Sequence, residues 1–125
     1  MKKILIVEDD RSISELLKHL LEGQNYEVKC AFDGLEGLEK VRKFNPDLVM
    51  MDVNMPRMNG FQLLQSLKSS PKTEDIPVIM CTENDLMGNV DAAYHLGVRG
   101  YVVKPFVSER VIKKVKEVLE NKQKA

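Results

Sequence analysis

A run of four apolar residues, Leu48 to Met51, constrains the fold of this chain more than any other stretch. The run is too short for a helix, and prolines stand on both sides of it, at Pro46 and Pro56. This pattern is typical of a strand that is buried on both faces, as in a parallel sheet covered by helices. The strand ends in a carboxylate, Asp52, and the reactive groups of open α/β sheets lie beyond the carboxyl ends of their strands. Asp52 is therefore the first candidate for a functional residue.

Four other segments carry strand patterns, and helical patterns separate them. We expect strands at residues 4–7, 26–31, 76–81 and 101–103, and helices that begin near Ser12, Asp33, Asn59, Asp85 and Ser108. Ser12 with Glu15 fits a capping box for the first helix. The second strand alternates in polarity and the fifth is short, so both belong at sheet edges. The sequence therefore predicts a doubly wound, five-stranded parallel sheet of order 2-1-3-4-5.

Length and charge limit the classes of function. A chain of 125 residues is expected to form a single domain over residues 1–125. Basic and acidic residues both total 19, so no net field favours direct DNA binding or a membrane surface. No apolar run approaches the ~18 residues of a membrane span. Cys30 and Cys81 would lie roughly 14 Å apart, too far for a disulfide, so we expect buried, reduced thiols in the cytoplasm.

Chemically related side chains stand at the carboxyl ends of four strands. Asp9 and Asp10 follow the first strand, Asp52 the third, Thr82 the fourth and Lys104 the fifth. Carboxylates about 5 Å apart repel by about 3 kcal/mol per pair at an effective dielectric constant of about 20, so a divalent cation is expected among them. Oxygen ligands without His or Cys favour Mg²⁺ over Ca²⁺ or Zn²⁺. This group of side chains suits phosphoryl transfer.

Four spaced motifs together resemble the receiver domain of two-component response regulators. They are Val7-Glu8-Asp9-Asp10, Asp52 with Met55-Pro56-x-Met58-Asn59-Gly60, Thr82, and Lys104-Pro105-Phe106. The similarity covers essentially the whole chain. It implies a flavodoxin-like (βα)5 fold and a receiver of the single-domain type used in chemotaxis or sporulation relays.

The resemblance implies a role for each site residue. Asp52 would accept a phosphoryl group from the phosphohistidine of a histidine kinase or phosphotransfer protein, in a reaction that needs Mg²⁺. Asp9, Asp10, Asp52 and the backbone carbonyl of Asn54 would hold the metal, with Asp10 the more direct ligand. Lys104 and Thr82 would bind the phosphoryl oxygens, and the peptide bond between Lys104 and Pro105 would be cis.

The resemblance also implies a conformational switch. On phosphorylation Thr82 shifts, Tyr101 rotates inward, and the face formed by helix 85–96 and strand 101–103 changes for an output partner. The family usually has a small residue after the hydroxyl, whereas this chain has Glu83 followed by Asn84. We expect these two side chains to restrict the access of small phosphodonors or water to the site.

Two other classes of function remain open. A small aspartyl-phosphate phosphatase or phosphotransferase of the haloacid-dehalogenase type usually has Asp-x-Asp after the first strand and a cap domain, neither of which this chain shows. A flavodoxin-like cofactor binder would need a Gly/Ser/Thr run in the first loop. As a receiver, the chain would not be an enzyme acting on other substrates. It would be a cytoplasmic monomer with an unknown output protein. The alternative to a monomer is a dimer that forms through the face of helix 85–96 and strand 101–103.

Overall fold

The computed structural model describes residues 1–55, 57–82 and 97–124, and it contains five strands and four helices within those ranges. In chain order they are β1 (Lys3–Val7), α1 (Arg11–Glu22), β2 (Glu27–Ala31), α2 (Gly34–Phe44), β3 (Leu48–Asp52), α3 (Gly60–Lys68), β4 (Val78–Thr82), β5 (Gly100–Val103) and α5 (Ser108–Lys124). The helix expected over residues 85–96 lies outside the described residues, as do Glu83 and Asn84.

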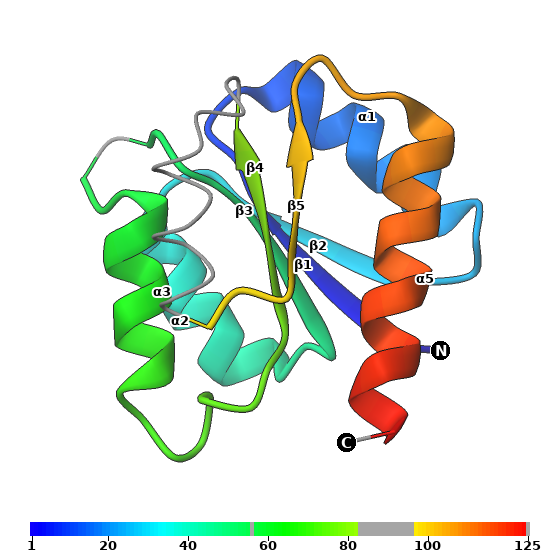
Figure 1. Cartoon of the computed structure of the whole chain (residues 1–125). Coiled ribbons are helices and arrows are strands. Elements are labelled where there is room, and N and C mark those ends of the chain that lie inside the picture. The colour runs from blue at the N-terminus through cyan, green and yellow to red at the C-terminus, as the bar shows by residue number, and fades with distance from the viewer. Residues whose placement is uncertain (56, 83–96, 125) are drawn as a thin grey trace.

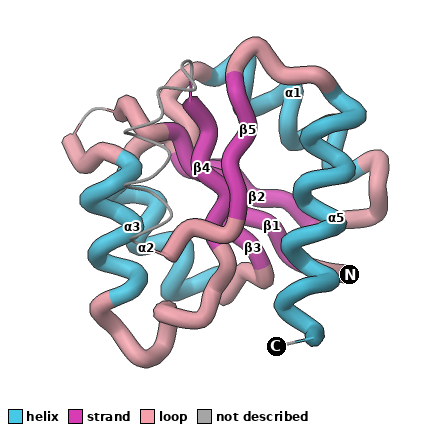
Figure 2. Tube along the Cα trace, in the orientation of Figure 1, coloured by secondary structure: helices cyan, strands magenta, loops and turns pink. Residues whose placement is uncertain are grey.

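The strands form one parallel sheet in the order β2-β1-β3-β4-β5, which confirms the predicted order. The two strands with edge patterns, β2 and β5, lie at the two edges. Helices α2 and α3 cover one face of the sheet and α1 and α5 cover the other (Figure 1, Figure 2). The carboxyl ends of β1, β3, β4 and β5 therefore meet at one edge of a three-layered molecule.

The core has two halves because successive strand residues point to opposite faces. One half, under α2 and α3, includes Leu5 and Val7 of β1. The other half, under α1 and α5, includes Ile4 and Ile6. All five residues of β3 and all five of β4 are buried, as the apolar run at 48–51 predicts.

The helix starts agree with the sequence at three helices, including α5, which begins at Ser108, and differ at α1. Asp33 caps α2 by accepting from the Glu36 amide, and Asn59 caps α3 in a full capping box with Gln62. The start expected at Ser12 is wrong, because α1 begins at Arg11 and its cap is Asp10, whose Oδ1 accepts from the amide of Ile13 at 3.1 Å. This correction changes the interpretation of the acidic site below.

Two smaller expectations concern the cysteines and the membrane. Both cysteines are free thiols, and Cys81 is buried, whereas Cys30 is only half-buried and not fully buried as expected. Of the helices in the described ranges, none has both the length and the apolar character required to cross a membrane.

Candidate functional site

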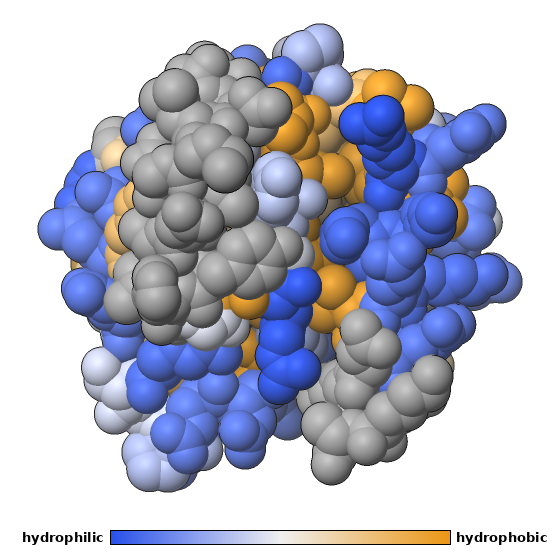
Figure 3. Space-filling view, in the orientation of Figure 1, coloured by the Kyte–Doolittle hydropathy of each residue, from blue (hydrophilic) through white to orange (hydrophobic). Residues whose placement is uncertain are grey.

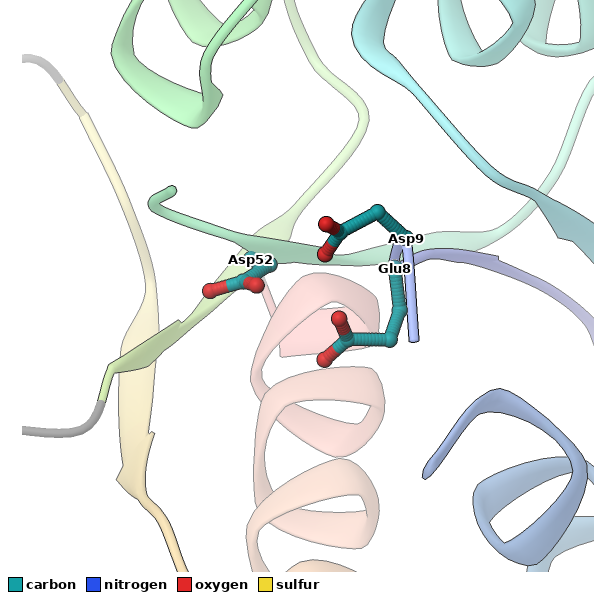
Figure 4. Close-up of side chains that lie close together, drawn as sticks. All are labelled: Glu8, Asp9 and Asp52. Atoms are coloured by element: carbon teal, nitrogen blue, oxygen red, sulfur yellow. The ribbon is translucent and has the colours of Figure 1, made fainter. Parts of the chain in front are cut away.

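Three carboxylates gather at the carboxyl ends of β1 and β3. Glu8, Asp9 and Asp52 each present an oxygen, and these three oxygens lie within 4.8 Å of one another. Figure 4 shows the three carboxylate groups turned toward a common space from the two strand ends. Glu8 and Asp52 are buried, with exposed fractions of 2% and 6%, whereas Asp9 is exposed. The cluster is thus a pocket in which Glu8 and Asp52 are buried and Asp9 is exposed to solvent.

Strand register explains why Glu8 meets Asp52. Strands β1 and β3 pair with Ile6 beside Met50, and both side chains face α1 and α5. Side chains two residues apart along a strand point to the same face of the sheet. Glu8 and Asp52 hold these positions at the neighbouring strand ends, so they lie side by side on that face.

Lys104 supplies the positive charge of the pocket. Its Nζ lies 2.6 Å from Oε1 of Glu8 and donates a hydrogen bond to Oδ2 of Asp52 at 3.1 Å. Its backbone amide donates to the Thr82 carbonyl at 2.7 Å, which ties the start of the following loop to β4. The peptide bond from Lys104 to Pro105 is cis. Lys104 therefore reaches both buried carboxylates from the end of β5.

Burial and charge shift two pKa values in the pocket. Burial raises the pKa of Glu8 from 4.5 to about 7, and the charge of Asp52 acts in the same direction, while contacts with Lys104 and the Asp10 amide oppose the shift. Burial alone would lower the pKa of Lys104, but its contacts with Glu8 and Asp52 outweigh burial and raise it. Lys104 is therefore a cation at neutral pH, and Glu8 holds a proton more readily than an ordinary Glu does.

The loop after β3 fixes the second oxygen of Asp52. The amide of Asn54 donates to Oδ1 of Asp52 at 3.3 Å. The α3 helix starts directly against the strand end, because the Gly60 amide donates to the Val53 carbonyl at 2.9 Å. A Cβ atom at Gly60 would overlap the carbonyl oxygen of Asp52. Asp52 is therefore held at both carboxylate oxygens and at its backbone.

The acids that the structure brings together differ by one residue from the predicted set. Asp10 was expected to be the more direct metal ligand, but it is exposed, caps α1 and does not belong to the cluster. Glu8 belongs to the cluster instead, and the sequence reasoning missed it. Two signals could have identified it: Asp10 stands three residues before the first apolar helix residue, which is a cap position, and Glu8 continues the inward phase of Ile4 and Ile6.

The other predicted residues lie around the same strand ends. Thr82 is the last residue of β4 and is buried, and Tyr101 of β5 is half-buried and packs against the core half under α2 and α3. The two predicted access residues, Glu83 and Asn84, lie outside the described residues.

A groove runs beside the pocket between β5 and α5. Its volume is about 550 Å³, and its lining includes Tyr101, Val103 and Val107 together with the cations Arg110 and Lys113. Val103 and Val107 are exposed by 36% and 54%. Figure 3 shows hydrophobic residues gathered over β5 beside the hydrophilic outer side of α5. The surface next to the pocket is therefore a mixed apolar and basic strip.

The pocket fits a small, hard divalent cation. Among the residues that the structure describes, three carboxylates of the pocket face one cation, Lys104. The buried Oε1 of Glu8 pairs with Nζ of Lys104 at 2.6 Å. The donor set consists of oxygens alone, which suits Mg²⁺ better than softer metals.

A model of the response regulator receiver domain family matches residues 4–116. The chain belongs to this family, and the fold and the acidic pocket agree with that membership. It is 35% identical over 119 residues to the DNA-binding dual master transcriptional regulator RpaA of Synechocystis sp., covering 95% of this chain and 49% of that protein. It is 34% identical over 117 residues to the response regulator MprA of Mycobacterium leprae, covering 94% of this chain and 50% of that protein.

Solved structures agree with the sequence relatives. The chemotaxis protein CheY4 of Vibrio cholerae superposes with a TM-score of 0.90 at 34% identity, over 94% of this chain and 98% of that one. The chain spans about half the length of the curated relatives RpaA and MprA. The alternative of a haloacid-dehalogenase-type phosphatase finds no support in these matches.

Proposed function

We propose that this receiver domain accepts a phosphoryl group on Asp52 from the phosphohistidine of a histidine kinase or a phosphotransfer protein. One observation carries the proposal. Asp52 is buried at a strand end, where Lys104 and the Asn54 amide each hold one carboxylate oxygen and two further carboxylates face it. A carboxylate in that setting is oriented for nucleophilic attack and is not merely a solvated strand end.

The transfer of the phosphoryl group requires no reactant other than the phosphohistidine and Asp52. A carboxylate oxygen of Asp52 forms a bond to phosphorus, the bond from phosphorus to the imidazole nitrogen breaks, and the histidine leaves with the electron pair. Lys104 stays protonated throughout because its pKa is raised. Its ammonium group lies 3.1 Å from Asp52 and can therefore balance the charge of the incoming phosphoryl oxygens. Thr82, at the end of the neighbouring strand, would bind one of those oxygens through its hydroxyl.

We assign the Mg²⁺ ligands to Glu8, Asp9, Asp52 and the backbone carbonyl of Asn54. When bound there, the ion would supply electrostatic stabilisation of the charge on the phosphoryl oxygens. Glu8 and Asp9 serve to bring two negative charges to the ion from β1, while Asp52 must keep one oxygen available for the phosphoryl group. Asp10 has no part in this assignment, because its carboxylate is occupied at the start of α1.

The face that includes β5 is the candidate surface for binding an output partner. We propose that phosphorylation is relayed through Thr82 and Tyr101 to the face that includes β5, and that an output protein, or a second copy of a chain that is otherwise monomeric, binds there. The exposed Val103 and Val107 and the neighbouring cations support this choice. The balance of 19 basic and 19 acidic residues argues against direct DNA binding by these residues. Catalysis would be limited to the domain's own phosphorylation and dephosphorylation, in the cytoplasm.

The proposal is tested with a small phosphodonor. The protein is incubated with acetyl phosphate, with and without Mg²⁺, and acid-labile phosphate is located by mass spectrometry after borohydride trapping. We expect one phosphoryl group on Asp52, dependent on Mg²⁺ and absent from Asp52→Asn. Modification at another residue, or turnover of added phosphate esters, would contradict the proposal.

A matched pair of variants tests the corrected metal ligand. Asp10→Asn keeps a good helix cap and should retain Mg²⁺-dependent phosphorylation, whereas Glu8→Gln removes a ligand charge and should raise the Mg²⁺ concentration required by about tenfold or more. The opposite order of effects would restore Asp10 as the ligand.

A further inference from the structure

The turn between β2 and α2 contributes no ligand to the acidic cluster, yet it contacts both loops that do. On one side it meets the loop that follows β1. The backbone amide of Glu8 donates to the carbonyl of Ala31 at 3.0 Å. The guanidinium carbon of Arg11 lies 4.1 Å from the centre of the Phe32 ring, close enough for a cation–π contact. The loop that carries Glu8 and Asp9 is thus bonded at one end to the last residue of β2, and at its other end the first residue of α1 contacts Phe32 of the turn.

On the other side, the same turn meets the loop that follows β3. Oδ2 of Asp33 pairs with Nη1 of Arg57 at 3.0 Å, while Oδ1 of Asp33 caps α2 by accepting from the Glu36 amide at 2.8 Å. The next residue, Gly34, lies so close to Met58 that an added Cβ would overlap both the carbonyl oxygen and the side chain of Met58. The loop that carries Asn54 is thus seated directly on the turn.

The backbone of Arg57 adopts a conformation that the loop would not favour without its contacts to the turn. Arg57 has φ of 70°, in the left-handed region that non-glycine residues seldom adopt. Such a conformation persists where surrounding contacts fix it. Among the described residues, the contacts there are the ion pair between Arg57, whose side chain is 62% exposed, and Asp33, whose side chain is 17% exposed, and the packing of Met58 on Gly34.

We propose that the turn Phe32–Gly34 is a positioning element for the metal site, because it braces the two ligand loops against each other through Arg11 on one side and Arg57 and Met58 on the other. This inference rests on the proposed function and adds to it a group of residues that touch neither the metal nor the phosphoryl group. The brace sets the separation between Glu8 and Asp9 on one loop and the Asn54 carbonyl on the other.

The consequence for metal binding follows from the coordination chemistry. Mg²⁺ requires near-octahedral geometry and short ligand distances, so it tolerates little change in the spacing of its ligands. Residues that orient metal ligands typically alter affinity by 10–100-fold when they are replaced. Loosening the brace should therefore weaken Mg²⁺ binding more than it weakens the fold.

The experiment compares variants that separate positioning from stability. Asp33→Asn keeps the cap of α2, because Asn is as good a cap as Asp, but it removes the charge that holds Arg57. Arg57→Gln removes the partner charge, and Arg57→Lys retains it. Glu39→Gln is the control, since it breaks the exposed ion pair of Glu39 with Lys43 on the outer side of the same helix.

Two quantities are measured for each protein. Mg²⁺ affinity is obtained from the amide NMR shifts of Asp9 and Asn54 during a Mg²⁺ titration, a readout that does not require phosphorylation. Stability without metal is obtained from urea unfolding in EDTA. Gly34→Ala is measured in the same way, and Asp33→Asn keeps the test decisive if Gly34→Ala fails to fold.

We expect Asp33→Asn and Arg57→Gln each to weaken Mg²⁺ binding about tenfold. The double variant should be no weaker than either single variant, and Arg57→Lys and Glu39→Gln should stay within about threefold of the wild type. Wild-type affinity in Asp33→Asn and Arg57→Gln would overturn the brace, as would a weakening in proportion to lost stability or additive losses in the double variant. A wild-type protein without Mg²⁺-dependent shifts would instead overturn the proposed metal site itself, so the two failures are distinguishable.

Discussion

At the scale of single residues, folding and function oppose each other at Glu8. The side chain is 2% exposed, and its carboxylate faces Asp52 and Asp9 with one lysine to balance the group. A carboxylate placed there for fold stability alone would be a poor choice, because burial of its charge is unfavourable. The proposed Mg²⁺ ion would offset this cost, and the cost should be measurable when no ion is present.

Glu8→Gln should therefore change the pH dependence of stability in EDTA. The pKa of Glu8 is about 7 in the folded protein against 4.5 for an ordinary Glu, so the folded state binds this proton more tightly than the unfolded state does. The resulting stabilisation is complete below pH 4.5 and is lost as the pH rises through 7. A shift of this size corresponds to about 3 kcal/mol. The measurement is urea unfolding of both proteins at pH 4.5, 6 and 8.

The quantity to follow is the stability of the wild type minus that of Glu8→Gln, because other titrating groups cancel in the difference. We expect this difference to fall by up to about 3 kcal/mol from pH 4.5 to pH 8. A difference that stays constant, or that grows with pH, would show that Glu8 is already ionised at no cost to the fold.

At the scale of elements, α3 contacts β3, the strand that carries Asp52, through the first residue of the helix. Gly60 is the first residue of α3, and its amide bonds to Val53 while its Cα faces the carbonyl of Asp52. The helix can approach β3 this closely only because a side chain is lacking at that position. The sequence shows a glycine after a Met-Asn pair, but the reason for it appears only when α3 is packed on the strand end.

Gly60→Ala should lower stability by about 2–4 kcal/mol, because the new methyl group meets backbone atoms that cannot rotate away. Gly23→Ala is the control: Gly23 has an ordinary right-handed conformation after α1, and its Cβ would meet the Leu20 carbonyl only at 3.3 Å. Urea unfolding of both variants measures the effect. If Gly60→Ala were as stable as Gly23→Ala, α3 would have room to shift. The placement of Asp52 would then not depend on the position of α3.

At the scale of the whole molecule, the sequence predicts the sheet better than it predicts the site. The strand order is predictable because continuous apolar runs mark the central strands, whereas the alternating segment and the short segment mark the two edges. Asp33 and Asn59 correctly predict the starts of α2 and α3. The absence of Asp10 from the cluster has a physical cause. Asp10 stands three residues before Ile13 and caps α1, whereas alternation along β1 places Glu8 on the same face as Ile4 and Ile6.

Contacts between loops were also beyond the reach of the sequence. Nothing in the residues Asp33 and Arg57, which are 24 positions apart, indicates that they form an ion pair across two turns. Helical spacing predicts that Leu16 and Leu35 face the core, but their side chains are 58% and 42% exposed. Periodicity gives the direction of a helix face, whereas the depth of each position depends on how neighbouring elements pack.

The charge balance of the whole chain allows one final test of the acidic pocket. Basic and acidic residues are equal in number, so added salt has little net charge to screen and a general ionic effect on stability should be small. Mg²⁺ that binds only the folded protein should add about 1.4 kcal/mol at ten times its dissociation constant. At one fixed Mg²⁺ concentration the increment should be larger at pH 8 than at pH 6, because binding requires Glu8 to lose the proton that its raised pKa favours. Urea unfolding with Mg²⁺, against Na⁺ at equal ionic strength, measures the increment, and an equal gain in Asp52→Asn or with Na⁺ would place the ion outside the pocket.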